Sequence, residues 1–256
     1  MSRTLLVIGA TVMLVRNEIA ELRAVSYTHL FFVTMAISMA AQLFVKSAYG
    51  KWSGVRNSQG LTGLQVGQEL LRDTDLGATY QMSKGTGVQF LGIAGNLTDH
   101  YDPRTHTVAL SEGVANKPTV AAMAIVAHEL GHAQQYATKS PWIAMRSFLL
   151  PAIRFSPMVS YAFIFIGLIL NVTGLMYVGI FFFGLGVLFS VITLPVEIDA
   201  SRRALKLLKE AGMMQTADDA KGAQQVLTAA ATTYIAAAIT AILQLLYYLS
   251  LANRRR

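Results

Sequence analysis

The chain of 256 residues contains no cysteine, and charged residues make up only 14% of it. The absence of cysteine excludes disulfide bonds, thiolate metal sites and a cysteine nucleophile in any compartment. A soluble domain of this length carries nearly twice this charged fraction, about 25%. With 54% hydrophobic residues, the chain cannot cover its apolar content with polar surface. An ordinary cytosolic enzyme is therefore excluded, and so is a disordered chain, which needs low hydrophobicity and high charge.

Lysine, arginine, aspartate and glutamate are missing from three long runs of the sequence. These runs are 24–45, 155–196 and 222–253, with 22, 42 and 32 residues. About 20 apolar residues cross a hydrocarbon core of ~30 Å as a helix. The first and last runs each fit one span, and the middle run fits two, separated by a turn at Asn171-Val-Thr-Gly174. We therefore predict four membrane spans, at 25–45, 157–173, 176–195 and 229–250.

The predicted fold is mainly α-helical and integral to the membrane, with about four transmembrane helices and one zincin-like α+β polar domain. The segments are an N-terminal extension at 1–23, a transmembrane helix at 24–45, the polar domain at 46–154, a transmembrane hairpin at 155–196, a third-ligand helix and loop at 197–222, and a transmembrane helix with a basic tail at 223–256.

Local signals predict the elements of the polar domain. Thr62 is a candidate N-cap for a helix that ends near Arg72. The β-prone stretch 88–93, turn residues at 101–105 and the stretch 107–110 predict a strand pair, with 107–110 as the returning strand of a hairpin. This returning strand is also a candidate edge along which a peptide substrate adds as a further strand. Pro118 suits the first turn of the helix predicted at 118–138.

The predicted helix 118–138 carries the sequence His128-Glu-Leu-Gly-His132, an HExxH motif. Residues four apart lie on the same face of a helix, so both imidazoles can reach one metal ion. Zn²⁺ accepts imidazole nitrogen and tolerates three protein ligands plus a water. Glu129 projects beside such an ion and can accept a proton from the water that the metal activates. Two buried histidines beside a carboxylate, or a non-catalytic metal site, are the alternative interpretations.

A third ligand must come from another segment. The remaining histidines are His29, in a predicted span, and His100 and His106, around the predicted turn. Glu197 follows Pro195 at the end of the third span and is predicted to open a helix. A glutamate at the membrane edge is costly unless it binds something, and two histidines with one glutamate form a known catalytic zinc set. The alternative is a surface charge that complements the dipole of a helix N-terminus.

The assignment of Glu197 constrains how the chain crosses the membrane. The segment between the histidine helix and Glu197 must cross an even number of times, because the three ligands must meet on one side. One continuous helix through the charge-free 42 residues would separate the ligands by about 60 Å. A two-span hairpin returns Glu197 to the histidines, so the run length, its central break and the metal site agree.

Five stretches of the sequence resemble the YugP-like family, a bacterial family of membrane-bound neutral zinc metallopeptidases. They are the motifs His128-Glu-Leu-Gly-His-Ala-Gln134, Thr98-Asp-His-Tyr-Asp-Pro-Arg-Thr105, Leu110-Ser-Glu-Gly-Val114, Glu197-Ile-Asp-Ala-Ser-Arg-Arg-Ala204 and Lys51-Trp-Ser-Gly-Val-Arg-Asn-Ser-Gln-Gly-Leu-Thr-Gly63. The resemblance covers about 30–256 and leaves 1–27 outside. It implies zinc at His128 and His132, Glu129 as the catalytic base and Glu197 as the third ligand.

The HtpX and prenyl-protein endopeptidases are more distantly similar. In that family an aspartate lies four residues after the ligand glutamate, whereas this chain has Ser201 there and its aspartate at Asp199. A role of Asp199 beside a zinc histidine and a surface or capping role are therefore both open. An oxyanion stabiliser is also expected, for which Tyr136, His100, Arg202 and Arg203 are candidates. Asp99 and Asp102 are expected to stabilise turns rather than to bind a cation.

The sequence thus predicts a zinc-dependent membrane metallopeptidase, with an endopeptidase reaction favoured. Its expected cofactor is Zn²⁺, its expected substrate is a peptide or a membrane protein, its surroundings are the lipid bilayer of a cell membrane, and no nucleic acid is expected. A membrane scaffold with a structural or inert zinc site is the alternative function. A transporter with a metal-binding gate would need polar residues inside the spans, which contain almost none.

The arginines at the two ends of the chain bear on orientation. Four spans place both termini on the side opposite the metal site. Arg3, Arg16, Arg23 and Arg254-Arg-Arg256 indicate cytoplasmic termini and an outward site. The five basic residues of 197–221, with Lys46 and Lys51 beside the first span, weaken this charge bias and leave the orientation open.

Overall fold

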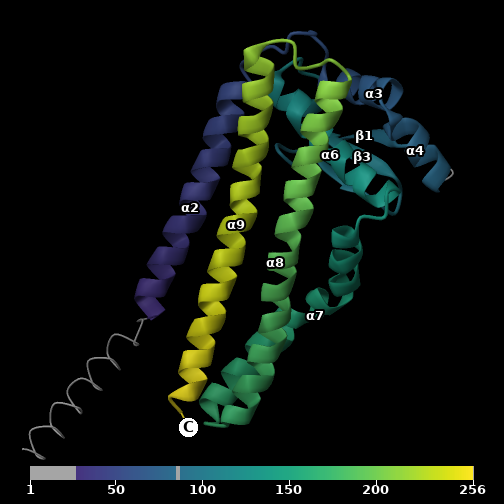
Figure 1. The fold of residues 1–256 in the computed structure, drawn as a ribbon. Coiled ribbons are helices and arrows are strands. Elements are labelled where there is room, and N and C mark those ends of the chain that lie inside the picture. Colours follow the sequence, from purple (N-terminus) through teal and green to yellow (C-terminus); the bar gives the residue numbers. More distant parts are fainter. Residues whose placement is uncertain (1–26, 85–86, 256) are drawn as a thin grey trace, which may run out of the picture.

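The computed structural model describes residues 27–84 and 87–255. Four long helices form a slanted bundle, and a small domain of short helices and strands sits against one end of it (Figure 1). The long helices are α2 (Tyr27–Trp52), α7 (Pro141–Ile169), α8 (Thr173–Glu210) and α9 (Ala217–Asn253). The small domain contains α3 (Gly63–Asp73), α4 (Asp75–Lys84), β1 (Gln89–Ile93), β2 (His100–Asp102), β3 (Thr107–Ser111), α5 (Glu112–Ala115) and α6 (Val120–Ala137). The extension predicted at 1–23 lies outside the described residues.

All four long helices are long and apolar enough to cross a membrane. They leave large apolar side chains exposed along their outer faces, among them Phe31, Phe165 and Phe181. A water-soluble protein would bury such a surface, whereas lipid accommodates it. The predicted number of membrane spans is therefore confirmed. Helices α8 and α9 extend beyond the predicted spans at both ends, and α2 continues past the predicted end at 45. Helix α7 begins before the predicted start at 157 and ends at Ile169, four residues before the predicted end.

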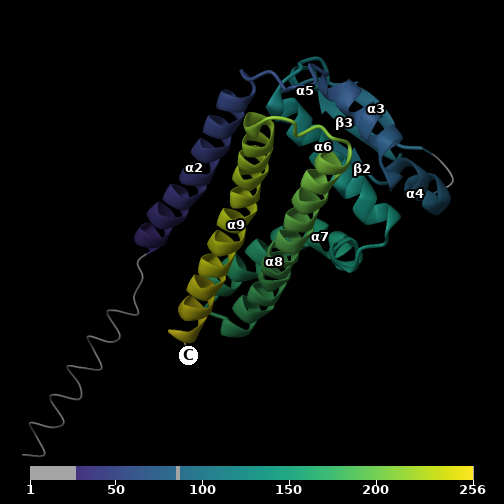
Figure 2. The same cartoon turned by 45° about the horizontal axis from the view of Figure 1, so that its top comes forward.

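Helices α7 and α8 form the predicted hairpin. The chain reverses between them at Asn171, whose φ of 54° is in the left-handed region that asparagine tolerates. The two helices approach closely at Gly179, where an added Cβ would lie 2.7 Å from the carbonyl oxygen of Ser160. Small residues allow such contacts between helices in a membrane. Figure 2 shows α7 changing direction between its start near α6 and its end beside α8, and α7 contains two internal prolines, which break the hydrogen-bond ladder.

Helix α8 continues without a break from Thr173 through Pro195 to Glu210. The prediction that Glu197 opens a new helix is therefore wrong. A proline inside a helix removes one backbone hydrogen bond, and the surrounding packing of α8 tolerates that loss. Because Glu197 lies well inside the helix and is buried, the dipole of a helix N-terminus does not account for it.

The small domain is built around α6, which has 13 of its 18 residues buried. Helix α3 packs against it and begins at the predicted cap. The Thr62 side chain accepts from the backbone N–H of Gln65, and the Gln65 side chain accepts from the backbone N–H of Thr62. This reciprocal capping box satisfies two backbone donors and fixes where α3 starts. Helix α6 begins at Val120, two residues later than predicted, with Thr119 as its N-cap.

The three strands form one sheet in the order β1-β3-β2. Strand β3 pairs with β1 in parallel and with β2 in antiparallel orientation. The hairpin that precedes β3 is therefore made with β2, and the stretch 88–93 is a parallel neighbour rather than the other arm. The expectation that 107–110 is an edge strand is wrong, because β3 is central and both of its edges are paired. Among the described strands, β1 and β2 are the edges.

Candidate metal centre

Two segments far apart in the sequence supply the metal-binding group. Helix α6 carries His128 and His132, and α8 carries Glu197. The Nε2 atom of His128 lies 3.3 Å from Oε2 of Glu197, and Nε2 of His132 lies 3.6 Å from the same oxygen. Their potential ligand atoms all lie within 4.8 Å of one another. The structure thus brings together the two histidines and the glutamate that the sequence analysis had named.

The donor set fits a zinc ion. Glu197 is only 3% exposed, and among the described residues its ion-pair partners are the two histidines, with no lysine or arginine. A buried carboxylate needs a cation or several hydrogen-bond donors, because desolvation of its charge is costly. Two imidazole nitrogens and one carboxylate oxygen are a ligand set of catalytic zinc sites that leaves one position open.

Helix α6 and helix α8 meet closely because of Gly131, which lies between the two histidines in the sequence. A Cβ added at Gly131 would lie 2.4 Å from the carbonyl oxygen of Ala200 on α8. Only glycine allows the two backbones to approach to this distance without displacement. The contact places Glu197, one turn before Ala200, within reach of both imidazoles.

The far nitrogen of each imidazole also has a partner. Nδ1 of His132 lies 3.0 Å from Oε1 of Gln135, and Nδ1 of His128 lies 3.3 Å from Oγ of Ser201. Hydrogen bonds of this kind hold a metal-binding ring in one orientation and keep its other nitrogen available. Ser201, four residues after Glu197, therefore lies where the distant resemblance places an aspartate.

Gln135 connects His132 to Asp199. Its amide nitrogen donates to the carbonyl oxygen of Val196 at 2.8 Å and to Oδ2 of Asp199 at 2.7 Å. The same Asp199 oxygen accepts from Nε of Arg203 at 2.8 Å. Asp199 therefore does not contact a histidine directly. It is connected to His132 through the Gln135 amide, and it also pairs with Arg203. Sequence reasoning missed Gln135, although its position three residues after His132 places it on the same face of the helix.

The electrostatic setting of His132 follows from this arrangement. Burial of the ring disfavours its protonated form, but the hydrogen bond with Glu197 and the charges of Glu129 and Glu197 outweigh burial, so the pKa of His132 is raised. The carboxylates around His132 thus stabilise its protonated form.

A cavity of about 720 Å³ opens beside the metal-binding group. Glu129 lines it, as do two of the predicted oxyanion stabilisers, His100 and Tyr136. Arg202 is exposed and Arg203 pairs with Asp199, and neither is among the residues that line this cavity. Strand β2 contributes to the cavity wall, so the free sheet edge beside the site is β2 rather than β3.

Tyr234 is a further residue of the site that the sequence analysis did not identify. It lies on α9 and lines both the 720 Å³ cavity and a second one of about 220 Å³, which His128 and Glu129 also line. Its hydroxyl lies within electrostatic reach of Glu197, Glu129 and Arg146. No local motif marks Tyr234, because only the packing of α9 on α6 and α8 directs it toward the metal-binding group.

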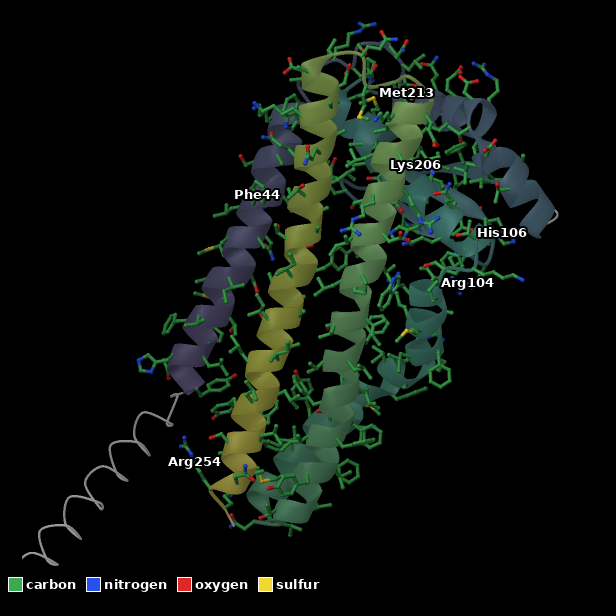
Figure 3. All side chains as sticks on the ribbon, in the orientation of Figure 1. Phe44, Arg104, His106, Lys206, Met213 and Arg254 are labelled. Atoms are coloured by element: carbon green, nitrogen blue, oxygen red, sulfur yellow. The ribbon has the colours of Figure 1, made fainter. Side chains whose placement is uncertain are left out.

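The other predicted residues are not part of the metal-binding group, although Asp99 and Asp102 line its cavity. His29 is exposed in the first turn of α2. His106 lies in the β2–β3 turn with a φ of 58°, at the outer edge of the small domain near Arg104 (Figure 3). Asp102 accepts from the backbone N–H of Arg104 at 2.9 Å, and Asp99 accepts from the backbone N–H of Ser111 at 2.7 Å. Asp102 thus stabilises the β2–β3 turn, as predicted, whereas Asp99 connects the residue before β2 to the end of β3.

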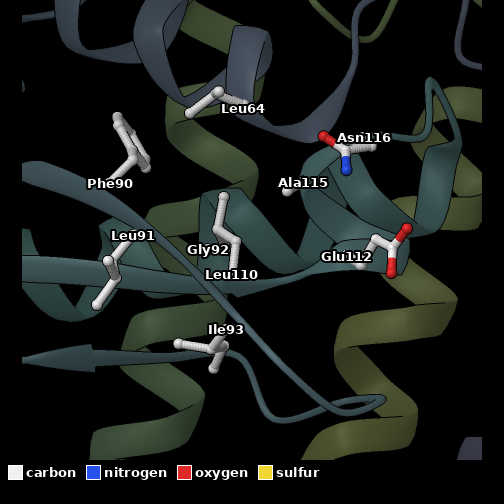
Figure 4. A pocket seen from close by; sticks show the side chains of 9 residues that line it. All are labelled: Leu64, Phe90, Leu91, Gly92, Ile93, Leu110, Glu112, Ala115 and Asn116. Carbon is white, nitrogen blue, oxygen red and sulfur yellow. The ribbon is translucent and has the colours of Figure 1, made fainter.

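A separate cavity of about 350 Å³ lies along the outer edge of the sheet at β1 (Figure 4). Mostly apolar residues line it, and its polar side chains are Glu112 and Asn116. It shares no residue with the metal-binding group, so this cavity is distinct from the candidate metal centre.

Comparisons with known proteins agree with this chemistry. Residues 27–253 match the family model described as "Putative neutral zinc metallopeptidase", and the chain belongs to that family. It is also 33% identical over 222 residues to the "Putative membrane protease YugP" of Bacillus subtilis (strain 168), with 87% of this chain and 94% of that protein covered. No solved structure matches the chain. With its four long apolar helices, the protein is a multi-pass membrane protein.

Proposed function

We propose that the protein is a membrane-bound metallopeptidase that hydrolyses peptide bonds at a zinc ion held by His128, His132 and Glu197. The observation that carries this proposal is the convergence of the three donor atoms within 4.8 Å at the wall of a 720 Å³ cavity. A bound zinc ion would supply Lewis acidity, which polarises a carbonyl group and makes water more acidic. The substrate we propose is a peptide or a segment of a membrane protein.

Glu129 is the proposed general base. It follows the first ligand histidine on α6, it is 7% exposed, and it lines the cavity. A carboxylate there can accept a proton from the attacking water and pass it to the leaving amine. Glu197 is committed to the two imidazoles, so the two glutamates of the site have separate roles.

Tyr136, His100 and Tyr234 are the side chains placed to donate a hydrogen bond to the developing oxyanion, because all three line the same cavity. Of these, Tyr234 also lines the second cavity, together with His128 and Glu129. Gln135 and Ser201 hold the histidine rings and take no direct part in the reaction.

The variant Glu129→Gln tests this proposal. We expect the purified full-length protein to keep about one zinc per chain while peptide hydrolysis falls by about 10²–10⁴-fold, the contribution typical of a general base. Zinc is measured by elemental analysis and hydrolysis with a mixed pool of quenched fluorescent peptides. Glu112→Gln, an exposed glutamate outside the metal-site cavity, is the matched control and should retain wild-type activity.

Two other outcomes would contradict the proposal. Equal hydrolysis by the wild type and the Glu129→Gln variant would show that Glu129 is not the base. Full zinc occupancy without hydrolysis of any peptide by the wild type would favour the alternative, a membrane scaffold whose zinc site is structural.

A further inference from the structure

Arg146 enters the metal-site cavity from α7 without a carboxylate partner. It lines the same cavity as His128, Glu129 and Glu197. Its Nε atom is buried and has no hydrogen-bond partner. Among the described residues no ion pair involves Arg146, although four carboxylates line the same cavity. A buried arginine donor without a hydrogen-bond partner is costly, so its presence indicates a ligand that accepts this hydrogen bond.

Packing holds the Arg146 side chain in place. Its guanidinium lies over the ring of Phe189 on α8, 5.8 Å from the ring centroid. Arg146, Glu197 and Tyr234 all line this cavity. A stacked guanidinium retains its donors for a planar anion, and two parallel N–H groups match the two oxygens of a carboxylate.

A second arginine extends the positive charge along the same wall. Arg154 lies two helical turns after Arg146 on α7, lines the same cavity and is exposed. Three of the four carboxylates of the cavity have other partners, because Glu197 faces the imidazoles, Asp99 accepts from Ser111, and Asp102 pairs with Arg104. The fourth, Glu129, forms no ion pair with either arginine of α7 among the described residues. The α7 side of the cavity therefore carries two arginines without a carboxylate partner there.

We propose that Arg146 selects peptide substrates by binding a carboxylate close to the scissile bond, with Arg154 attracting the same negative charge from farther out. The carboxylate has two sources in a peptide, the free C-terminus and the side chain of aspartate or glutamate. This inference rests on the proposed peptidase function, because only that function places a peptide in the cavity. It makes Arg146 a determinant of specificity.

Binding to a catalytically impaired protein tests the proposal. Full-length, zinc-loaded Glu129→Gln protein in detergent is titrated with three dansyl-labelled decapeptides of one apolar sequence. The first is amidated and neutral, the second has a free C-terminal carboxylate, and the third is amidated with one central glutamate. We expect one of the two acidic peptides to bind about 10- to 100-fold more tightly than the neutral one. The acidic peptide that gains identifies the source of the carboxylate.

The Arg146→Ala substitution in the same protein should abolish this preference, and Arg146→Lys should restore part of it, because lysine keeps the charge without the bidentate geometry. Arg202→Ala is the matched control, since it removes the same charge from an exposed position outside the cavity and should leave the preference unchanged. Zinc content and monodispersity establish that each variant is folded. Arg146→Gln serves in place of the alanine variant if that variant is not folded.

Three results would overturn the inference. One is equal binding of all three peptides by the Glu129→Gln protein with Arg146 intact. Another is a preference that survives in Arg146→Ala. The last is a protein whose Arg146-dependent ligand is an anionic lipid, seen as loss of bound phosphatidylglycerol in Arg146→Ala while peptide preference is unchanged. Because binding is measured without turnover, failure of this inference is distinct from failure of the peptidase proposal, which the hydrolysis assay decides.

Discussion

Helices α2 and α6 are both apolar, yet their surroundings are opposite. Helix α6 buries 13 of its 18 residues under other parts of the chain, whereas the buried residues of α2 are four of 26. Helix α6 lies among α3, α8, α9 and the sheet, while α2 contacts mainly α9 and leaves most of its apolar side chains exposed. Apolar composition alone therefore does not distinguish a helix covered by protein from one covered by lipid. The length of the run without charged residues distinguishes these two kinds of helix.

The metal-binding group lies where these two kinds of helix meet. The histidines come from α6, the buried helix of the small domain, and Glu197 comes from α8, which also supplies a membrane span. Folding of the small domain and packing of the bundle therefore both contribute to the site. If both regions contribute to the site, changes in either region should weaken it, and the expected effects range from the loss of a ligand to a single added methyl group.

Removal of a metal ligand from α6 or from α8 should lower zinc affinity in both cases. We expect His128→Ala and Glu197→Ala each to lower zinc affinity by more than the 10–100-fold typical of residues that only orient a ligand. The measurement is zinc competition with a chelator on the purified protein. Glu210→Ala, which alters an exposed glutamate paired with Lys206 on the same helix, is the control. Retention of zinc by Glu197→Ala would show that the site belongs to α6 alone.

A lysine introduced at an exposed leucine should have different effects on the surface of a membrane span and on the surface of the small domain. Leu188 on α8 is 45% exposed and Leu91 on β1 is 56% exposed. We expect Leu188→Lys to cost about 2.5–3.5 kcal/mol of membrane insertion, because a charge at the centre of a span is poorly solvated. Leu91→Lys should change stability by no more than about 0.5 kcal/mol. Insertion efficiency and thermal unfolding in nanodiscs measure both effects. Similar values at the two positions would contradict the assignment of α8 as a span.

The Gln135 amide joins the two regions by hydrogen bonds, and its loss should weaken the site without dismantling it. We expect Gln135→Ala to lower zinc affinity by about 10–100-fold, because His132 loses the partner that orients its ring. Gln65→Ala, which changes a glutamine of the small domain that caps α3, should leave zinc affinity unchanged. Unchanged affinity in Gln135→Ala would show that packing alone holds His132.

The close contact between α6 and α8 should be sensitive to a single methyl group. We expect Gly131→Ala to cost about 1–3 kcal/mol by overpacking, offset by up to ~1 kcal/mol because alanine favours a helix. Gly184→Ala on α8 is the control, because no atom lies within 4 Å of its added Cβ. Thermal unfolding with zinc content measures both variants. A more stable Gly131→Ala protein with full zinc would contradict the proposed role of this contact.

Much of this arrangement could be predicted locally. Charge-free runs longer than a bilayer requires gave the four spans, because a chain without charges has no means of covering that length in water. The capping box at Thr62 and the helical spacing of His128 and His132 were equally local, since each depends on residues within one turn. The reversal at Asn171 followed from the same run length.

Contacts between elements could not be predicted in this way. The position of β3 at the centre of the sheet depends on pairing with β1, which is distant in the chain. The continuity of α8 through Pro195 depends on packing that compensates for one missing hydrogen bond. Tyr234 and Arg146 carry no motif, and only the packing of α7 and α9 around α6 and α8 brings them to the metal-binding group. Gln135 is close to His132 by helical spacing, but its hydrogen bonds to Val196 and Asp199 depend on the packing of α8 against α6.

The sequence by itself determined the membrane spans and the pair of histidines on one helical face, because both follow from the period of a helix and the thickness of a bilayer. Only the tertiary structure decided that Glu197 meets these histidines from the middle of a continuous helix, through the close approach at Gly131. It also decided that Arg146 faces the same cavity. The physical reason is that helical periodicity acts over a few residues, whereas the site is assembled by packing between helices that are far apart in the chain.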